Sequence, residues 1–359
     1  MIQIHDFAED GRPTGYIDEE YPENCHYAVI NKRDYGILIR AGLIKEGLHF
    51  IPNPIKPHRI PDNKEKKDII LYPVRAIRRK NIGEAVLLSL FLNNDVKIGI
   101  TLEPTSALDM KSYTGWIDFV KSENLKVLFR LGIENDYQTV LSRSRSMITT
   151  SIKEGFGLSF LEPWTVGRML YGRLLPDICS DFKEKGLQLG HLYERVSVPL
   201  EFFNRHRFYI KWKNCYRQKL RMYGMSFKES KIDEDFHRLT GDGLIDFGCL
   251  SEDIQKQVIL NVLKSANSLE KMLDLNPLLE NTNFFNDSFE IIEKNKRVVE
   301  EEYSFQRNKN TLIGVYNSVL NRTVTHSIDK KVLLEAFNTA EKNHLLLCDS
   351  AYGEGNIPY

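Results

Sequence analysis

The sequence predicts an α/β protein built on a doubly wound parallel sheet. From residue 68 to residue 169, short apolar runs typical of buried strands alternate with longer segments of helical periodicity. Strands that alternate with helices form βαβ units, in which the strands are parallel. Beyond about residue 205 the alternation stops, and the remaining apolar patterns are helical. We therefore expect one parallel sheet with a helical region after it.

The length and composition fit a globular protein with more than one core. The 359 residues exceed the usual size of one domain, which is about 100–200 residues. Hydrophobic residues make up 42% of the chain and charged residues 27%, which is ordinary for a globular protein. The 49 basic and 49 acidic side chains cancel. We expect no nucleic-acid partner, because a general nucleic-acid binder needs a basic excess.

The N-terminus, the hydropathy pattern and the cysteines indicate a cytoplasmic protein. No run of about 18 apolar residues is present, so we expect no transmembrane segment. Residues 1–7 carry no basic and apolar signal-peptide pattern. A local basic patch such as residues 205–221 leaves attraction to a membrane surface open. The cysteines form no C-x-x-C pair, so we expect reduced structural thiols and no zinc site. They are Cys25, Cys179, Cys215, Cys249 and Cys348.

The first 56 residues form the first predicted unit. Strand signals occupy residues 2–4, 27–30 and 49–51, and a helix is expected from residue 31 or 34 onward. Prolines at positions 52, 54, 57 and 61, followed by a lysine-rich stretch at residues 64–67, are the best linker signal in the chain. We therefore expect the first unit to span residues 1–56.

The alternating region after the linker forms the second predicted unit, over residues 57–205, and a mainly helical region follows over residues 206–359. Within the second unit, strands are expected at residues 68–72, 96–101, 127–131 and 146–151, and helices at 82–92, 113–123, 137–142 and 158–169. In the last region, helices are expected at residues 250–275, 289–303, 311–320 and 330–347.

The most informative stretch is a glycine-rich turn after the strand at residues 146–151. In open α/β sheets, ligands bind beyond the carboxyl ends of strands. Glycines there let backbone N–H groups approach an anion. Two glutamates eight residues apart mean little alone, and a solvated loop with a surface glutamate is the alternative. The context favours an anion-binding site. The turn reads Glu154, Gly155, Phe156, Gly157 and Leu158, with Glu162 inside the predicted helix.

This stretch resembles the Glu-x7-Glu signature of retaining glycosyltransferases with two Rossmann domains, the GT-B type. The resemblance implies that Glu154 contacts the donor sugar and that Glu162 holds the ribose of the donor. It also implies that residues 155–158 approach the sugar and the diphosphate. The implied fold is GT-B: a Rossmann-like doubly wound sheet for the donor, a partial N-terminal Rossmann segment on the acceptor side, and a helical C-terminal region.

A basic segment after the first strand of the same sheet agrees with this resemblance. Residues 72–81 are similar to the Arg…Lys pair with which the family clamps the donor diphosphate. Arginine offers a fork of donors and lysine a compact charge, so together they can replace a metal ion. We favour Arg75 with Lys80 and leave Arg78 and Arg79 open, and a solvated basic helix start is the alternative. The resemblance implies no metal and no cofactor besides the donor substrate.

Three further segments carry a weaker likeness to the same family. Residues 4–10 resemble a segment of the acceptor domain in which a histidine lies near the sugar. His5 would then hydrogen-bond the sugar or stabilise developing charge, and a purely structural histidine is equally open. Asn53-Pro54 resembles the crossover between the domains. Residues 172–177 resemble a loop facing the cleft, so Arg173 and Asp177 are either acceptor contacts or structural residues.

The resemblance implies an enzyme that transfers a sugar from a nucleoside diphosphate sugar to an unknown acceptor with retention. The first domain is about 100 residues shorter than a complete one would be. The alternative is therefore a donor-binding subunit, or an inactive relative, whose active site a partner chain completes. A sugar-nucleotide epimerase would need titrating acid and base groups in the cleft, which the Glu-x7-Glu arrangement disfavours. The sequence identifies neither the donor's base and sugar nor the acceptor.

Overall fold

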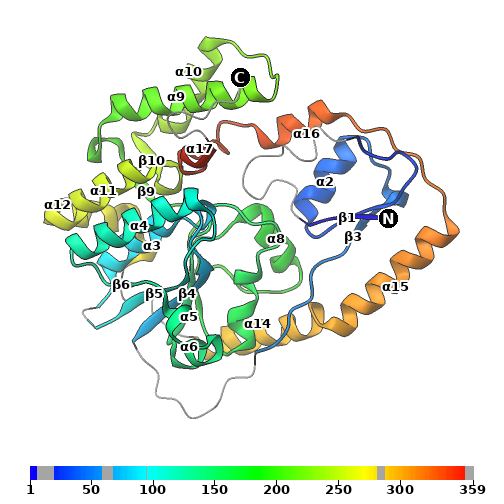
Figure 1. The fold of residues 1–359 in the computed structure, drawn as a ribbon, viewed down its shortest axis with the longest axis horizontal. Helices are drawn as coiled ribbons and strands as arrows, with labels where there is room; N and C mark the ends of the chain where they lie inside the picture. Colours follow the sequence, from blue (N-terminus) through cyan, green and yellow to red (C-terminus); the bar gives the residue numbers. More distant parts are fainter. Residues whose placement is uncertain (6–19, 59–67, 94, 281–287, 352–359) are drawn as a thin grey trace.

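Two parallel sheets form the framework of the protein, for which a computed structural model describes residues 1–5, 20–58, 68–93, 95–280 and 288–351. One sheet has five strands, another has three, and helices pack around both (Figure 1). The predicted α/β class with parallel sheets is therefore confirmed. Two expected features, the segment from residue 6 to residue 10 and the lysine-rich end of the linker, lie outside the described residues.

The five-stranded sheet creates a crevice at the carboxyl ends of its central strands. Its order is β6-β5-β4-β7-β8, and all neighbouring strands are parallel. The chain winds outward from β4 to β6 and returns to β7, so the winding direction reverses between β4 and β7. Ligands of doubly wound sheets bind at this switch point. The strands are β4 (Ile69–Arg75), β5 (Lys97–Leu102), β6 (Val127–Leu128), β7 (Ser146–Thr149) and β8 (Leu170–Gly172).

Helices connect these strands and share one apolar core with them. Ile70 of β4, Val86 and Trp116 are all fully buried in this core. Capping side chains begin two of the helices. Ser106 accepts from the N–H of Asp109, and Asp136 accepts from the N–H of Thr139. The α-helices are α3 (Ile82–Leu88), α4 (Ala107–Ser122), α5 (Leu131–Glu134), α6 (Tyr137–Arg143) and α8 (Pro176–Glu184).

The predicted single helix over residues 158–169 is wrong. The structure has a 3-10 turn η4 (Leu158–Phe160), a single-turn helix α7 (Glu162–Thr165) and then the unpredicted strand β8. Pro163 has no N–H, so it fits the first turn of α7 but cannot continue a helix from η4. Gly167 then adopts a φ of +61°, which ends the helical turn. The apolar residues here face the core without helical periodicity.

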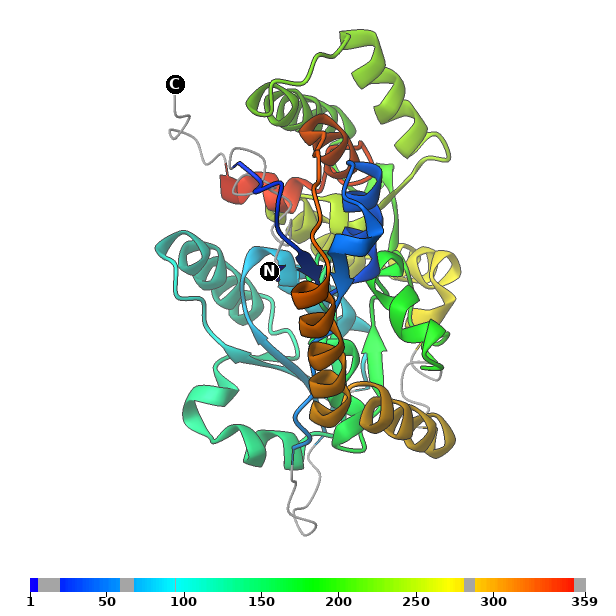
Figure 2. The ribbon, with the colours of Figure 1, turned by 90° about the vertical axis from the view of Figure 1, so that its right-hand side faces the viewer.

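The N-terminal unit is a three-stranded parallel sheet that helices from the far end of the chain complete. Its order is β1-β2-β3. Leu333 and Phe337 of α16 belong to its core, and Val315 of α15 packs on Ala28 and Ile51. Figure 2 shows α15 in front of the blue strands. The elements are β1 (Ile2–Ile4), β2 (Tyr27–Val29), α2 (Lys32–Arg40), β3 (Leu48–Phe50), α15 (Phe305–Asn321) and α16 (Lys330–Phe337).

The C-terminal region is mainly helical but includes a two-stranded antiparallel sheet of β9 and β10. The expectation of one helix over residues 250–275 is wrong. The structure has two helices there, because Ser265 is extended and caps the second one. The expected helix over residues 330–347 is likewise two helices, α16 and α17. The remaining elements are β9 (Ser197–Pro199), α9 (Arg205–Met222), α10 (Glu229–Thr240), β10 (Leu244–Asp246), α11 (Glu252–Lys264), α12 (Ala266–Leu275), α14 (Phe289–Glu302) and α17 (Leu345–Ala351).

Short 3-10 turns lie at the ends of several helices and strands. They are η1 (Lys45–Gly47), η2 (Arg78–Lys80), η3 (Ser89–Phe91), η5 (Leu200–Phe202), η6 (Phe247–Cys249) and η7 (Pro277–Leu279). None of the described helices is long and apolar enough to cross a membrane.

A disulfide joins Cys215 of α9 to Cys348 of α17, across 133 residues of sequence. The expectation that all five cysteines are reduced thiols is therefore wrong for this pair. Cys25, Cys179 and Cys249 are free, as expected. Tertiary packing of α17 against α9 brings the two sulfur atoms together, and no local spacing in the sequence could show it.

Candidate functional site

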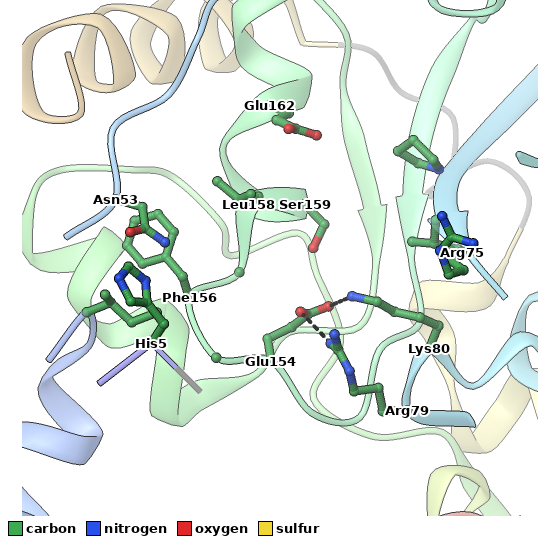
Figure 3. Close-up of a pocket in the computed structure, with 15 residues that line it drawn as sticks. His5, Asn53, Arg75, Arg79, Lys80, Glu154, Phe156, Leu158, Ser159 and Glu162 are labelled. Carbon is green, nitrogen blue, oxygen red and sulfur yellow. Dashed lines mark hydrogen bonds and ion pairs between the residues drawn. The ribbon is translucent and has the colours of Figure 1, made fainter. Parts of the chain in front are cut away.

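A pocket of about 540 Å³ opens at the switch point, beyond the carboxyl ends of β4 and β7 (Figure 3). Segments far apart in the sequence contribute its walls: the end of β1, the linker, the end of β4 with η2, and the glycine-rich turn. Each donor or catalytic residue predicted from the sequence lines it. The lining residues are His5, Ile30, Asn53, Pro73, Val74, Arg75, Arg79, Lys80, Glu154, Gly155, Phe156, Gly157, Leu158, Ser159 and Glu162.

The glycine-rich turn follows β7 and is held in place by close packing. Gly157 has a φ of +89°, and a Cβ there would lie 2.9 Å from the ring of Phe160. Only glycine fits both the backbone angle and the space. The side chain of Asn31 donates to the carbonyl oxygen of Gly155 at 2.8 Å, which ties the turn to the N-terminal unit. The turn therefore has a fixed path past the pocket.

The carboxylate of Glu154 lies between two cations at the centre of the site (Figure 3). Arg79 donates to it at 3.1 Å and Lys80 at 2.5 Å. Glu154 is 6% exposed, so these charges interact in a partly desolvated environment. The site thus combines two fixed cations with a buried carboxylate.

The arginine that reaches Glu154 is Arg79, not the favoured Arg75. Arg75 still lines the pocket, but its side chain is turned to the carbonyl oxygen of Glu103 at 3.3 Å. Arg78 points elsewhere and pairs with Glu252 at 3.2 Å. The 3-10 turn η2 directs Arg79 and Lys80 to Glu154 and Arg78 to Glu252, whereas Arg75 belongs to the end of β4. The sequence alone does not indicate which of the three arginines contacts Glu154.

Buried polar residues fix the position of η2. The hydroxyl of Tyr72 donates to the carbonyl oxygen of Lys80 at 2.6 Å, and Thr150 donates to the same oxygen at 3.1 Å. Burial raises the pKa of Tyr72 to about 12, so the hydroxyl keeps its proton as a donor. Asn81 follows in the left-handed region with a φ of 50°. Strands β4 and β7 thus set the place of Lys80.

Glu162 lies in the first turn of α7 and lines the pocket on the side away from His5 (Figure 3). Burial raises the pKa of its carboxyl group, and the nearby charge of Lys80 partly opposes that rise. Glu162 is thus the second carboxylate of the pocket, and the charge of Lys80 acts on it.

His5 and Asn53 form the wall contributed by the N-terminal unit. His5 follows β1 and Asn53 follows β3, and both lie beside Phe156 (Figure 3). The parallel strands of the smaller sheet therefore direct their carboxyl ends toward the same pocket as those of the larger sheet. The pocket lies between the two units, where each can contribute ligand contacts.

Arg173 has the structural role that the sequence left open. Its guanidinium donates to Glu84 at 3.0 and 2.5 Å and to both oxygens of Asp246 at 2.8 Å. Glu84 is fully buried and also accepts from Tyr193. This network joins the larger sheet to β10 and leaves Arg173 no access to a ligand. Asp177, by contrast, is exposed and lies 3.7 Å from the ammonium of Lys342.

The arrangement is suited to a ligand that carries both an anionic group and hydroxyls. Cations and backbone N–H groups of the turn can bind phosphate oxygens, and carboxylates can accept from hydroxyl groups. Within the described part of the chain, no group of three or more histidine, cysteine, aspartate or glutamate side chains could hold a metal ion.

Comparison with known proteins gives one curated relative. No protein-family model matches the chain. Over 96% of its length the chain is similar to mannosylglucosyl-3-phosphoglycerate synthase of Petrotoga mobilis, with 27% identity over 390 aligned residues. The match covers 75% of that protein, which is a glycosyltransferase. The predicted resemblance to glycosyltransferases is therefore confirmed.

Solved glycosyltransferase structures show a more distant likeness. Alr3699/HepE of Anabaena, solved with UDP and glucose, is 9% identical with a TM-score of 0.49, and the match covers 88% of this chain and 71% of that one. TarM is 16% identical with a TM-score of 0.45, covering 83% of this chain and 43% of that one. The chain thus spans less than half the length of TarM. At identities and TM-scores this low, the likeness carries no argument about function.

Proposed function

We propose that this chain transfers a sugar from a nucleoside diphosphate sugar to an acceptor, with retention at the anomeric carbon. The observation that carries the proposal is the pocket at the switch point, where Lys80, Arg79, Glu154 and Glu162 line one space with the glycine-rich turn. The similarity to a curated glycosyltransferase supports the reaction class. The pocket supports the donor class, because a donor of this kind has a diphosphate, a ribose and a sugar to bind.

The donor diphosphate would bind the cations of η2 and the backbone of the glycine-rich turn. The carboxylate of Glu154 holds Lys80 and Arg79 in place, so their charges are already oriented when the donor arrives. Arg75 at the pocket wall adds a third positive charge. Three cations balance the charge of a diphosphate without a metal ion.

The two glutamates would bind the hydroxyl groups of the donor. Glu154 is surrounded by the cations that hold the diphosphate, so its carboxylate lies where the sugar next to the phosphate would be. Glu162 lines the same pocket on another side, and a carboxylate there can accept from both ribose hydroxyls. Any nucleotide has this ribose, so the base remains to be identified by experiment.

The reaction would proceed on one face of the sugar. The bond between the anomeric carbon and the diphosphate oxygen breaks, and the acceptor oxygen bonds to the same face of that carbon. The leaving diphosphate takes the proton of the acceptor hydroxyl. Lys80 and Arg79 would stabilise the negative charge that develops on the diphosphate. His5, on the wall from the N-terminal unit, would contact the sugar from the acceptor side.

The name of the curated relative suggests which acceptors to test first. That protein's name specifies a product in which a disaccharide is attached to 3-phosphoglycerate. We propose 3-phosphoglycerate and its glucoside as the first acceptors for this chain, each combined with UDP-, GDP- and ADP-sugars.

The test is a transfer assay with the purified chain, in which the anomeric configuration of the product is read by NMR. We expect one donor to react with retention, and Glu154→Gln and Lys80→Met to lower kcat by at least about 100-fold. The matched controls are Glu335→Gln and Lys331→Met, an exposed ion pair on α16. Unchanged turnover in the two pocket variants would overturn the proposal. Donor binding without transfer would instead identify a donor-binding subunit that needs a partner chain.

A further inference from the structure

A second group of cations gathers beside the donor pocket but lines none of it. Its members come from four segments of the chain: Arg33 from α2, Lys153 from the loop after β7, Lys219 from α9, and Lys342 from the loop before α17. The charges of Lys219, Arg33 and Lys342 all act on Lys153. We call these four residues the cationic cluster. It lies where the N-terminal unit, the larger sheet and the C-terminal helices meet.

Two lysines of the cationic cluster, Lys153 and Lys219, lack the counter-charges that buried cations normally have. Lys219 is only 7% exposed, and within the described residues neither its ammonium nor that of Lys153 has a hydrogen-bond or ion-pair partner. The Nη2 atom of Arg33 is buried without a hydrogen-bond partner. Two carboxylates lie at the edge of the cluster: Asp34 accepts from Nε of Arg33 at 2.9 Å, and the exposed Asp177 lies 3.7 Å from the ammonium of Lys342.

Burying cations without partners is unfavourable, and this cost lowers the pKa values of the buried groups. Burial, with the neighbouring cations, lowers the pKa of Lys153 to about 7 and that of Lys219 to about 8. The same surroundings lower the pKa of His344 to about 3. Elsewhere in the fold a buried cation is fully paired, as Arg173 is with Glu84 and Asp246. A bound anion would remove this imbalance.

The cationic cluster adjoins the donor pocket through the backbone of Glu154. The carboxylate of Glu154 accepts from Arg79 and Lys80 in the pocket. Its carbonyl oxygen accepts from Arg33 at 3.4 Å, and Lys153 directly precedes it. An anion bound at the cluster would therefore be fixed next to the residue that we assign to the donor sugar.

We propose that the cationic cluster binds a phosphate or carboxylate group of the acceptor substrate. This inference rests on the proposed function, because it names the acceptor's chemical class. The donor diphosphate already has Arg75, Arg79 and Lys80 in the pocket, so the cluster is available for a second anion. Arg33 and Lys342 come from opposite ends of the chain and complete the cluster only in the folded protein.

The test is calorimetric titration of the full chain with 3-phosphoglycerate and inorganic phosphate, and separately with UDP and GDP. The variants are Lys219→Met and Lys153→Met, which keep the length of the side chain, with Lys331→Met on the surface as control and Lys80→Met as the pocket variant. We expect both cluster variants to weaken 3-phosphoglycerate binding at least 10-fold and to leave nucleotide binding unchanged. Retained nucleotide binding shows that each variant is folded.

Two results would overturn the inference. One is 3-phosphoglycerate binding that neither cluster variant changes. The other is 3-phosphoglycerate binding that Lys80→Met abolishes and the cluster variants do not, which would place the anion in the diphosphate pocket. A failure of the proposed function would look different from both results. In that case UDP and GDP would not bind, while the cluster variants would still weaken the binding of 3-phosphoglycerate.

Discussion

Replacing Arg173 by methionine removes the only cation of the buried network described above and keeps a side chain of similar length. In the intact protein the guanidinium of Arg173 forms ion pairs with Glu84, which is fully buried, and with Asp246. The variant leaves Glu84 without its counter-charge in a site that water does not reach. Removing one partner of a buried ion pair costs about 3–5 kcal/mol. We expect Arg173→Met to lower the free energy of unfolding by that amount at pH 7.

The magnitude follows from the protonation of Glu84. Without Arg173, the buried carboxyl group of Glu84 must take up a proton when the protein folds. In the unfolded chain its pKa is about 4.3, so protonating it at pH 7 costs about 3.7 kcal/mol. The lost hydrogen bonds to Asp246 add about 1 kcal/mol. Burial already raises the pKa of Glu84 with Arg173 present. A further rise of this pKa in the variant means that its stability is lost more steeply as the pH rises, so its deficit must shrink between pH 7 and pH 5.5, by at most about 2 kcal/mol.

The assay is equilibrium urea unfolding followed by tryptophan fluorescence at the two pH values. Lys271→Met is the control, since Lys271 pairs with Glu201 at 2.5 Å and the two side chains are 43% and 67% exposed. A surface pair of this kind contributes less than about 1 kcal/mol. The reasoning is refuted if Arg173→Met costs no more than Lys271→Met, or if its deficit grows as the pH falls.

Two further predictions concern Gly172, the last residue of β8, and Glu162, which we propose binds the ribose. Gly172→Ala destabilises the protein by at least about 3 kcal/mol, because φ is +104° and a Cβ would lie 2.1 Å from the carbonyl oxygen of Thr149. Gly190→Ala, with nothing within 4 Å of its Cβ, should change urea stability by less than about 0.5 kcal/mol, and equal losses would contradict this argument. Because burial raises the pKa of Glu162, donor affinity measured by calorimetry should decline with falling pH before an ordinary glutamate, with a pKa of about 4.3, would protonate. A Glu162→Gln variant with the same pH profile would rule out Glu162 as the titrating group.

The residues that the sequence predicted to act together line one pocket because they are local to strand ends. A buried apolar run followed by glycines places residues 154–158 at the carboxyl edge of a parallel sheet, whatever the rest of the fold does. The basic segment at residues 75–80 follows another strand of the same sheet. Neighbouring parallel strands end at one edge, so two such segments meet there.

Local patterns failed where packing over long distances decides the structure. The expected helix over residues 158–169 became two short turns and strand β8, because apolar residues that face a core on several sides lose helical periodicity. That Arg79 contacts Glu154 and Arg78 contacts Glu252 depends on the path of the turn η2, which the sequence does not encode locally. The disulfide between Cys215 and Cys348 depends on the contact of α9 with α17.

The sequence by itself determined the fold class, the strand ends that line the candidate pocket and the resemblance to glycosyltransferases, because each depends on residues close together in the chain. The tertiary structure alone decided which arginine meets Glu154, why Arg173 is structural, and that Arg33, Lys153, Lys219 and Lys342 converge. These features join residues up to about three hundred positions apart, and burial and charge act through space. Only the packed fold sets the distances that make a cation paired or unpaired.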